Sequence, residues 1–226
     1  MTADLERLYE LLQELETHLG GKRLLKNTTG RLKWPKRGVY FFFEPGESRA
    51  KNPKQPRVVR VGTHAISKGA RTTLWGRLRQ HRGNINGNGN HRGSIFRLHV
   101  GAALLNHPET KLTTPTWNKQ SVTKDEQERE RQLEQMVSTY LGRTELLWLA
   151  VNDEPGNNSD RAKIESNAIG LLTTAGRKVD PPSPSWLGNW DTHSQIRDGG
   201  LWNVNHVFSD YQPEFLEVLE HYIQAL

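Results

Sequence analysis

Apolar residues recur at helical spacing in several segments of the chain. From residue 3 to 19, leucines repeat every three or four positions, which places them on one face of a helix, and Gly20 and Gly21 end the pattern. Thr123 and Glu126 have the spacing of a capping box, so a long helix is expected to begin there. The same periodicity predicts the remaining helices over 72–83, 124–141, 160–174 and 215–223.

Runs rich in β-branched and aromatic residues predict three strands, at 38–43, 57–62 and 145–151. In the first of them, alternate side chains point to opposite sides, so that Val39, Phe41 and Phe43 share one face. Tyr40 and Phe42 share the other. The turn-rich connection between the first two strands predicts a long-looped antiparallel hairpin.

Two stretches have less regular patterns. Residues 94–105 alternate like a strand and also fit a helix, so both structures stay open. After Gly176 the chain is rich in Pro, Gly and Trp until the closing helix. We therefore expect an α/β (α+β) fold with a small antiparallel three-stranded central sheet flanked by helices. An N-terminal helix and basic linker (1–35) precede this unit (36–175), and a Trp/Pro-rich extension ending in a helix (176–226) follows it.

Positive charge is concentrated in one third of the chain. The net charge is +6 and the pI about 9.6, but residues 22–97 hold nineteen lysines and arginines against two acids. Such a field favours a polyanionic partner, because each neutralised phosphate releases counterions. Cysteine is absent, which excludes disulfides and thiolate metal sites. With no apolar stretch near the ~20 residues that cross a bilayer, we expect a cytoplasmic protein.

Four short motifs fall in a fixed order along the chain. They are "GVY" at 38–40, "RVG" at 60–62, "LWGRLRQH" at 74–81 and "AKIESNAI" at 162–169. This set resembles the GIY-YIG nucleases, which carry two such strand signatures, an arginine helix and a late glutamate. The resemblance covers residues 36–175 and is closest to the small bacterial type II restriction-endonuclease branch.

The resemblance implies a catalytic set of Tyr40, Arg60, Arg77, His81 and Glu165. Glu165 would hold one Mg²⁺ or Mn²⁺ per site, since these hard ions take carboxylate and water ligands. The guanidinium of Arg77 matches phosphate oxygens, and His81, one helical turn later, shares its face. Tyr40 would act on the attacking water.

The chain departs from the family pattern at three places. Arg60 stands where the family usually has a tyrosine, and residues 63–73 are an insertion. Asn167 is only a nearby substitute for an asparagine that many members carry further along. A free tyrosine has a pKa near ~10, and a neighbouring cation lowers it. We therefore hypothesise that Arg60 activates Tyr40 electrostatically.

Double-stranded DNA is the expected partner, contacted by basic or flexible loops at 44–57 and 83–93 and by neighbouring positive side chains. The expected contact residues are Lys51, Lys54, Arg57, His64, Lys68, Arg71, Arg79, Arg82 and Arg92. A homodimer would suit cleavage of both strands of a palindrome.

The expected function is a metal-dependent DNA endonuclease of restriction or phage-defence type. One alternative is a DNA-binding module whose nuclease site is degenerate. Another is a DNA repair or mobile-element nuclease, which would usually carry further domains, whereas only about 50 residues follow the central unit. A His/Asn-type metal nuclease around His91 is a weaker alternative, because nothing in the sequence places a second histidine beside it.

Overall fold

The computed structural model describes residues 2–177 and 179–226. Its strands are β1 (Arg23–Leu24), β2 (Gly38–Ser48), β3 (Pro56–Gly62) and β4 (Glu145–Ala150). Its α-helices are α1 (Thr2–Leu19), α2 (Leu74–Arg82), α3 (Ile95–Asn106), α4 (Lys124–Gly142), α5 (Asp160–Leu172), α6 (Ser194–Gly199) and α7 (Phe215–Gln224). Short 3₁₀ turns are η1 (Leu25–Asn27), η2 (His91–Gly93) and η3 (Leu187–Trp190).

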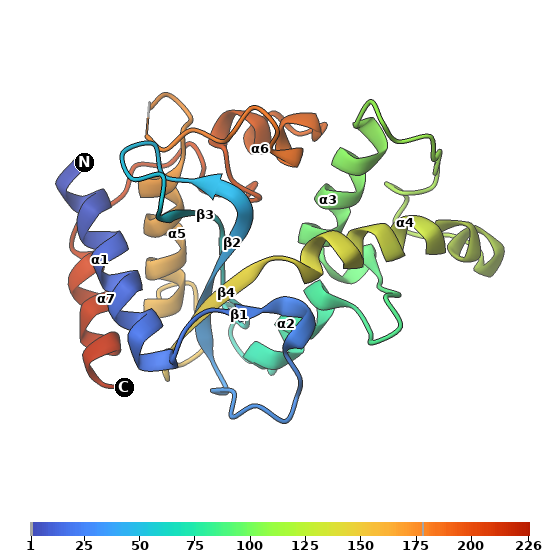
Figure 1. Ribbon diagram of the computed structural model, residues 1–226. Helices are drawn as coiled ribbons and strands as arrows, with labels where there is room; N and C mark the ends of the chain where they lie inside the picture. Colours follow the sequence, from blue (N-terminus) through green and yellow to red (C-terminus); the bar gives the residue numbers. More distant parts are fainter. Residues whose placement is uncertain (1, 178) are drawn as a thin grey trace.

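The four strands form one antiparallel sheet in the order β1-β4-β2-β3, with helices on both faces (Figure 1). The expectation of three strands is wrong by one. Arg23 and Leu24, in the basic linker, pair with the start of β4 and form a short edge strand. Two residues are too few to show an alternating pattern, so sequence periodicity misses this strand.

The aromatic strand β2 divides its side chains between the two faces, which confirms the predicted alternation. Val39, Phe41 and Phe43 lie in the core that α1, α5 and α7 cover. Tyr40 and Phe42 lie in the other core, under α2, α3 and α4. The ring of Phe42 packs 5.4 Å from that of Phe96 on α3. The sheet therefore separates two apolar cores, and Tyr40 belongs to the one that also contains the arginine helix α2.

Residues 94–105, which fit either a strand or a helix, form α3. Ser94 caps this helix by accepting a hydrogen bond from the backbone N–H of Arg97. Gly101 allows Trp117 to pack directly on the helix backbone, because a Cβ at this position would lie 2.1 Å from the indole ring. The predicted capping box at Thr123 and Glu126 is confirmed at the start of α4. Thr73 caps α2.

The hairpin between β2 and β3 is longer than the sequence pattern indicated. The strand β2 continues to Ser48, through residues expected to form a loop. Glu44 and Glu47, in this extension of the strand, are buried under the C-terminal residues. Glu44 accepts hydrogen bonds from Trp186 and Trp202, and these contacts hold the continued strand against the extension.

The C-terminal extension closes the free edge of β3. The backbone N–H of Trp202 donates to the carbonyl of Val59 at 2.7 Å. The side chain of Asn203 forms two hydrogen bonds with the backbone of Val61, one to its carbonyl and one from its N–H. An exposed strand edge is prone to pair with other chains, and this cover satisfies its polar groups. Among the described residues, no helix is long and apolar enough to cross a membrane.

Candidate active site

Three of the expected catalytic side chains line one pocket of about 330 Å³. Arg60 comes from β3, Arg77 from α2 and Glu165 from α5. His64, from the inserted segment, lines the same pocket. Residues that are far apart in sequence thus converge, because the end of β3 lies between α2 and α5.

Gly62, the last residue of β3, determines where the Tyr40 ring lies. The two residues are directly paired across the β2–β3 ladder. A Cβ on Gly62 would lie 2.4 Å from the phenol of Tyr40, so any larger residue would displace the ring. The glycine of the second signature motif therefore creates the space that the tyrosine of the first motif occupies.

Tyr40 is completely buried, and its hydroxyl oxygen lies 2.8 Å from Nε2 of His81 on α2. The other ring nitrogen of His81, Nδ1, lies 2.8 Å from the hydroxyl of Ser94. Ser94 already accepts a hydrogen bond from the backbone N–H of Arg97, so its own proton is best donated to Nδ1. In this arrangement Nε2 carries the hydrogen and donates it to the oxygen of Tyr40.

The His81 imidazole is neutral in this network. Burial holds its pKa well below the ordinary value, and the nearby charges of Arg77 and Arg60 lower it further. A neutral ring with a hydrogen on Nε2 stabilises negative charge on the phenolic oxygen of Tyr40. His81 was expected on the phosphate face beside Arg77; instead, the structure places it inside the protein, in contact with Tyr40.

Arg60 occupies the position between this buried pair and the pocket. Its guanidinium donates to the carbonyl of Trp202 and lies 4.8 Å from the ring centre of Phe96. Burial lowers the pKa of Arg60, whereas the charges of Tyr40 and Glu165 oppose that shift. Its Nε is buried without a hydrogen-bond partner among the described residues. Arg60 thus lies close to both Tyr40 and Glu165.

Glu165 provides a carboxylate that could hold a metal ion in the pocket. One carboxylate oxygen of Glu165 accepts the backbone N–H of Thr63 at 3.1 Å. Burial raises the pKa of Glu165, although the positive charges of Arg60 and Arg77 counteract part of the rise. These residues fit one hard divalent ion that takes a single carboxylate from the protein and keeps most of its water ligands.

The neighbouring imidazole of His64 carries an unused lone pair. Its Nδ1–H donates to the carbonyl of Thr72 at 3.0 Å, while Nε2 is buried without a partner among the described residues. Burial lowers the pKa of His64 to about 4, and the charge of Arg161 adds to this effect. At neutral pH the lone pair on Nε2 is therefore free to accept a hydrogen bond or to bind a metal.

Sequence reasoning missed the side chains that hold His64 and His81 in place. Arg161 is fully buried on α5 and donates to Asp153 and to the carbonyl of His64. It lies four residues before Glu165, so helical spacing could have placed the two on one face. Arg97 donates to the carbonyl of His81 at 3.0 Å, a contact for which the sequence gives no signal.

The expected DNA-contact residues fall into separate groups. Five of them are exposed, namely Lys51, Lys54, Lys68, Arg71 and Arg79. Arg57 is buried in an ion pair with Glu47, so its expected contact with DNA is not supported.

Arg92 is bound to Glu130 by two hydrogen bonds. Arg82 donates to a backbone carbonyl in the basic linker. Asn167 bonds the backbone of Lys163 and Gln212 and does not line the pocket.

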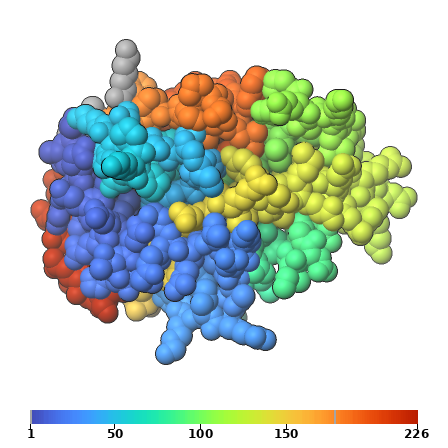
Figure 2. Space-filling model, in the orientation of Figure 1, coloured from blue at the N-terminus to red at the C-terminus, as the bar shows by residue number. Residues whose placement is uncertain are grey.

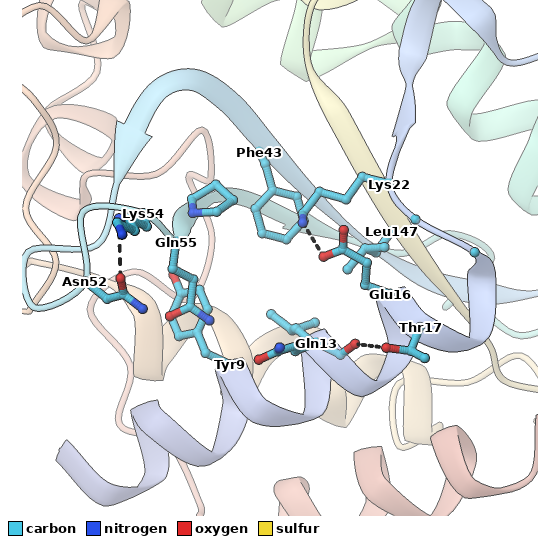
Figure 3. Close-up of a pocket in the computed structure, with 14 residues that line it drawn as sticks. Tyr9, Gln13, Glu16, Thr17, Lys22, Phe43, Asn52, Lys54, Gln55 and Leu147 are labelled. Atoms are coloured by element: carbon cyan, nitrogen blue, oxygen red, sulfur yellow. Dashed lines mark hydrogen bonds and ion pairs between the residues drawn. The ribbon is translucent and has the colours of Figure 1, made fainter.

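Lys54 lies on a different side of the hairpin from the catalytic candidates. It lines a pocket of about 550 Å³ between α1 and the β2–β3 hairpin, where Lys22 pairs with Glu16 (Figure 3). Neither Arg77 nor Glu165 lines this pocket. The 44–57 segment is thus directed towards α1, because the continued strand carries it past the catalytic pocket.

A basic surface that was not among the expected contacts lies in the linker before β2. Figure 2 shows residues 28–37 projecting from the lower edge of the molecule. Arg31, Lys33 and Lys36 are exposed on this segment. Trp34 stacks on Trp75 of α2, with ring centres 5.4 Å apart, so the linker is fixed beside the arginine helix.

The fold and the pocket can be compared with those of known protein families. The chain matches the family model of the GIY-YIG domain over residues 1–226, and it belongs to that family. GIY-YIG domains are nuclease domains, so the protein is a nuclease in the broad sense. No curated protein and no solved structure matches the chain significantly.

Proposed function

We propose that this protein is a metal-dependent DNA endonuclease of restriction or phage-defence type. One observation carries the proposal: Arg60, Arg77 and Glu165 line one pocket, although they come from three different elements. Two guanidinium groups can stabilise negative charge on a phosphate, and the carboxylate can hold the metal ion that stabilises it further. The resemblance of the four motifs to the restriction-endonuclease branch supports the biological role.

Each residue has a defined task in this reaction. Mg²⁺ or Mn²⁺, when bound at Glu165, would stabilise the charge that develops on the phosphate and the leaving oxygen. Arg77 binds non-bridging phosphate oxygens with its planar donor fork. His64 accepts a hydrogen bond from a pocket water through Nε2, because that lone pair has no partner among the described residues.

Tyr40 acts on the attacking water, with His81 donating to its oxygen and Arg60 close by. Tyr40 is buried and does not line the pocket. A bound phosphate would draw the guanidinium of Arg60 towards itself, because Nε of Arg60 has no hydrogen-bond partner among the described residues and the group's hydrogen bond is to a neutral backbone carbonyl. That movement would give the Tyr40 oxygen access to the water.

Double-stranded DNA is the proposed substrate, and the exposed basic residues of the linker and the insertion are its proposed contacts. Cleavage of both strands at a palindrome would use two copies of the chain related by a two-fold axis. The proposed dimer is tested by sedimentation of the protein with and without a cleavable duplex.

The central experiment incubates the purified chain with plasmid and phage DNA, with and without Mg²⁺ or Mn²⁺. We expect metal-dependent cleavage that Glu165→Ala abolishes, while DNA binding by that variant persists. Discrete fragments would show sequence-specific cutting of the restriction type, and smeared products would refute that specificity. Complete burial of Tyr40 favours one second candidate, a DNA-binding module without cleavage. Salt-sensitive binding with no cleavage of any substrate would establish that candidate instead.

A further inference from the structure

A second group of metal-ligand side chains lies between α3 and the C-terminal extension, outside the catalytic pocket. His99 on α3, and Asp191 and His193 between η3 and α6, each offer one ligand atom, and these atoms all lie within 4.8 Å of one another. None of the three lines the pocket that contains Glu165. We propose that they bind a zinc ion with three protein ligands, which fastens the extension to the catalytic unit.

The distances between the ligand atoms fit a tetrahedral ion. Nδ1 of His99 lies 3.2 Å from one oxygen of Asp191, and Nδ1 of His193 lies 3.5 Å from the other. Around a zinc ion with bonds of about 2.0–2.1 Å, neighbouring tetrahedral ligands are roughly 3.3 Å apart. Small rotations of the side chains therefore suffice to bring all three to one centre.

The charge of Asp191 provides a second, independent argument. Its side chain is 0% exposed, and among the described residues its ion-pair partners are only His99 and His193. Its other hydrogen bond comes from the backbone N–H of His193 at 2.7 Å. A buried carboxylate is costly without a countercharge, and the guanidinium of Arg197 donates to the backbone carbonyl of Asp191 rather than to its carboxylate. A divalent cation would neutralise it.

The donor set selects the type of metal. Two imidazole nitrogens and one carboxylate oxygen suit zinc, whereas Mg²⁺ and Ca²⁺ prefer ligand sets made of oxygen. His99 is buried, while the side chain of His193 is 49% exposed, so an ion can enter from the solvent on that side. Water would complete the tetrahedron there.

The location of the cluster gives the ion a function. The residue that caps α3 is Ser94, whose hydroxyl contacts the ring of His81. The extension continues from His193 through α6 to Trp202, whose carbonyl accepts a hydrogen bond from Arg60. An ion that links His99 to His193 would therefore hold together two segments that each support a residue of the proposed catalytic centre.

The test uses the full chain, stripped with a chelator and then reloaded with Zn²⁺ or Co²⁺ in the absence of DNA. We expect one zinc per chain by elemental analysis, the intense visible absorption of tetrahedral Co²⁺, and a thermal midpoint that rises on reloading. Asp191→Asn and His193→Ala should each weaken zinc binding by at least about 100-fold, because even loss of an outer-shell partner costs ~10–100-fold. His193 is half-exposed, so its truncation leaves the core intact.

Two control variants make the result specific. His221→Ala removes an exposed histidine from α7, and Glu165→Ala removes the proposed catalytic ligand; both should retain one tightly bound zinc. Zinc binding that survives Asp191→Asn and His193→Ala would overturn the proposal, as would a folded wild-type chain that binds no zinc. Because the measurement needs no cleavage, it is independent of whether the protein proves to be an active endonuclease.

Discussion

The hydroxyl oxygen of Tyr40 on β2 lies 2.8 Å from Nε2 of His81 on α2, and both side chains are completely buried. The pair connects the first strand signature to the arginine helix. The hydroxyl of Ser94 is hydrogen-bonded to Nδ1 of His81, so Nε2 is the nitrogen that donates to the oxygen of Tyr40. Tyr40 and His81 should therefore affect catalysis as one unit.

We expect Tyr40→Phe and His81→Gln each to lower kcat by about 10²–10⁴-fold, the range that general acid–base groups contribute. KM should change little, because neither side chain lines the pocket. The double variant should be no slower than the slower single variant, since residues acting as a unit are not additive. Steady-state cleavage rates of the three variants, with circular dichroism to confirm folding, test this. Multiplicative losses would show that the two residues act separately.

Arg60 gives a prediction about pH. If its charge activates Tyr40, then Arg60→Ala should move the activity limb that depends on loss of the Tyr40 proton to higher pH. Arg60→Lys should move this limb less, because it retains a positive charge. The measurement is the pH–rate profile of both variants beside the wild type. A limb that stays in place in both would mean that Arg60 does not activate Tyr40.

Local and periodic features of this fold could be predicted from the sequence. The alternation that separates Tyr40 from Phe41 follows from the two-residue period of a strand. The capping box of Thr123 and Glu126 depends on a three-residue spacing within one turn. Both are properties of short segments, and they hold wherever the segment packs.

Contacts between distant segments could not be predicted in this way. Arg97 is fully buried, and it donates a hydrogen bond to Glu134, which lies 37 residues away in the sequence. From the sequence alone, a charged residue such as Arg97 would be expected on a solvated surface. His99 meets Asp191 from 92 residues away, in a segment with no periodic pattern. Arg57 was expected on the surface because it is charged, but it is buried in an ion pair with Glu47, which is buried as well. Only the tertiary arrangement reveals these pairs.

The projecting linker gives a prediction about DNA binding. Neutralising Arg31, Lys33 and Lys36 with glutamine should weaken binding to all duplex sequences alike. If all three contact phosphates, the slope of log K against log salt should fall by about 2.7, since each contact contributes ~0.9. Fluorescence anisotropy over a salt series measures this slope. The matched control is Lys51→Gln with Lys54→Gln, in the hairpin beside α1, which should leave the slope unchanged.

Gly62 gives a prediction about packing. In Gly62→Ala, the new Cβ would lie 2.4 Å from the phenol of Tyr40, so the ring must move away from His81. We expect a loss of about 1–3 kcal/mol in the free energy of unfolding, as for other overpacked cores, together with a large loss of cleavage. Gly156→Ala is the control, because a Cβ there meets no atom within 4 Å. Equal stability of the two variants would show that the Tyr40 ring is not held against β3.

Glu44 is a buried carboxyl that joins the end of β2 to the extension. It accepts hydrogen bonds from the indole N–H groups of Trp186 at 3.0 Å and Trp202 at 2.6 Å, and from the hydroxyl of Tyr140 at 2.9 Å. Burial raises its pKa to about 7, although these hydrogen bonds oppose the rise. Between its unfolded and folded pKa values, the folded protein therefore binds the proton that the unfolded chain releases.

This difference makes stability fall as the pH rises. Because Glu44 is protonated in the folded state up to pH of about 7, its contribution is fully present below its ordinary pKa of 4.5 and is lost by about pH 7. The change amounts to at most about 3.5 kcal/mol, at ~1.4 kcal/mol per pKa unit. His64 has the opposite effect over a similar range, because its pKa is lowered to about 4 and the unfolded chain binds its proton more readily.

Glu44→Gln should separate these two contributions. The amide has a similar shape and keeps one acceptor oxygen but does not titrate, so the fall in stability between pH 4.5 and 7 that is due to Glu44 should disappear. The variant should then gain stability relative to the wild type as the pH rises to 7. Urea unfolding at intervals of half a pH unit measures the difference between the two proteins, which cancels the contribution of His64. Glu217→Gln on the exposed face of α7 is the control. A difference that stays constant across the range would mean that Glu44 is ionised in the folded protein throughout.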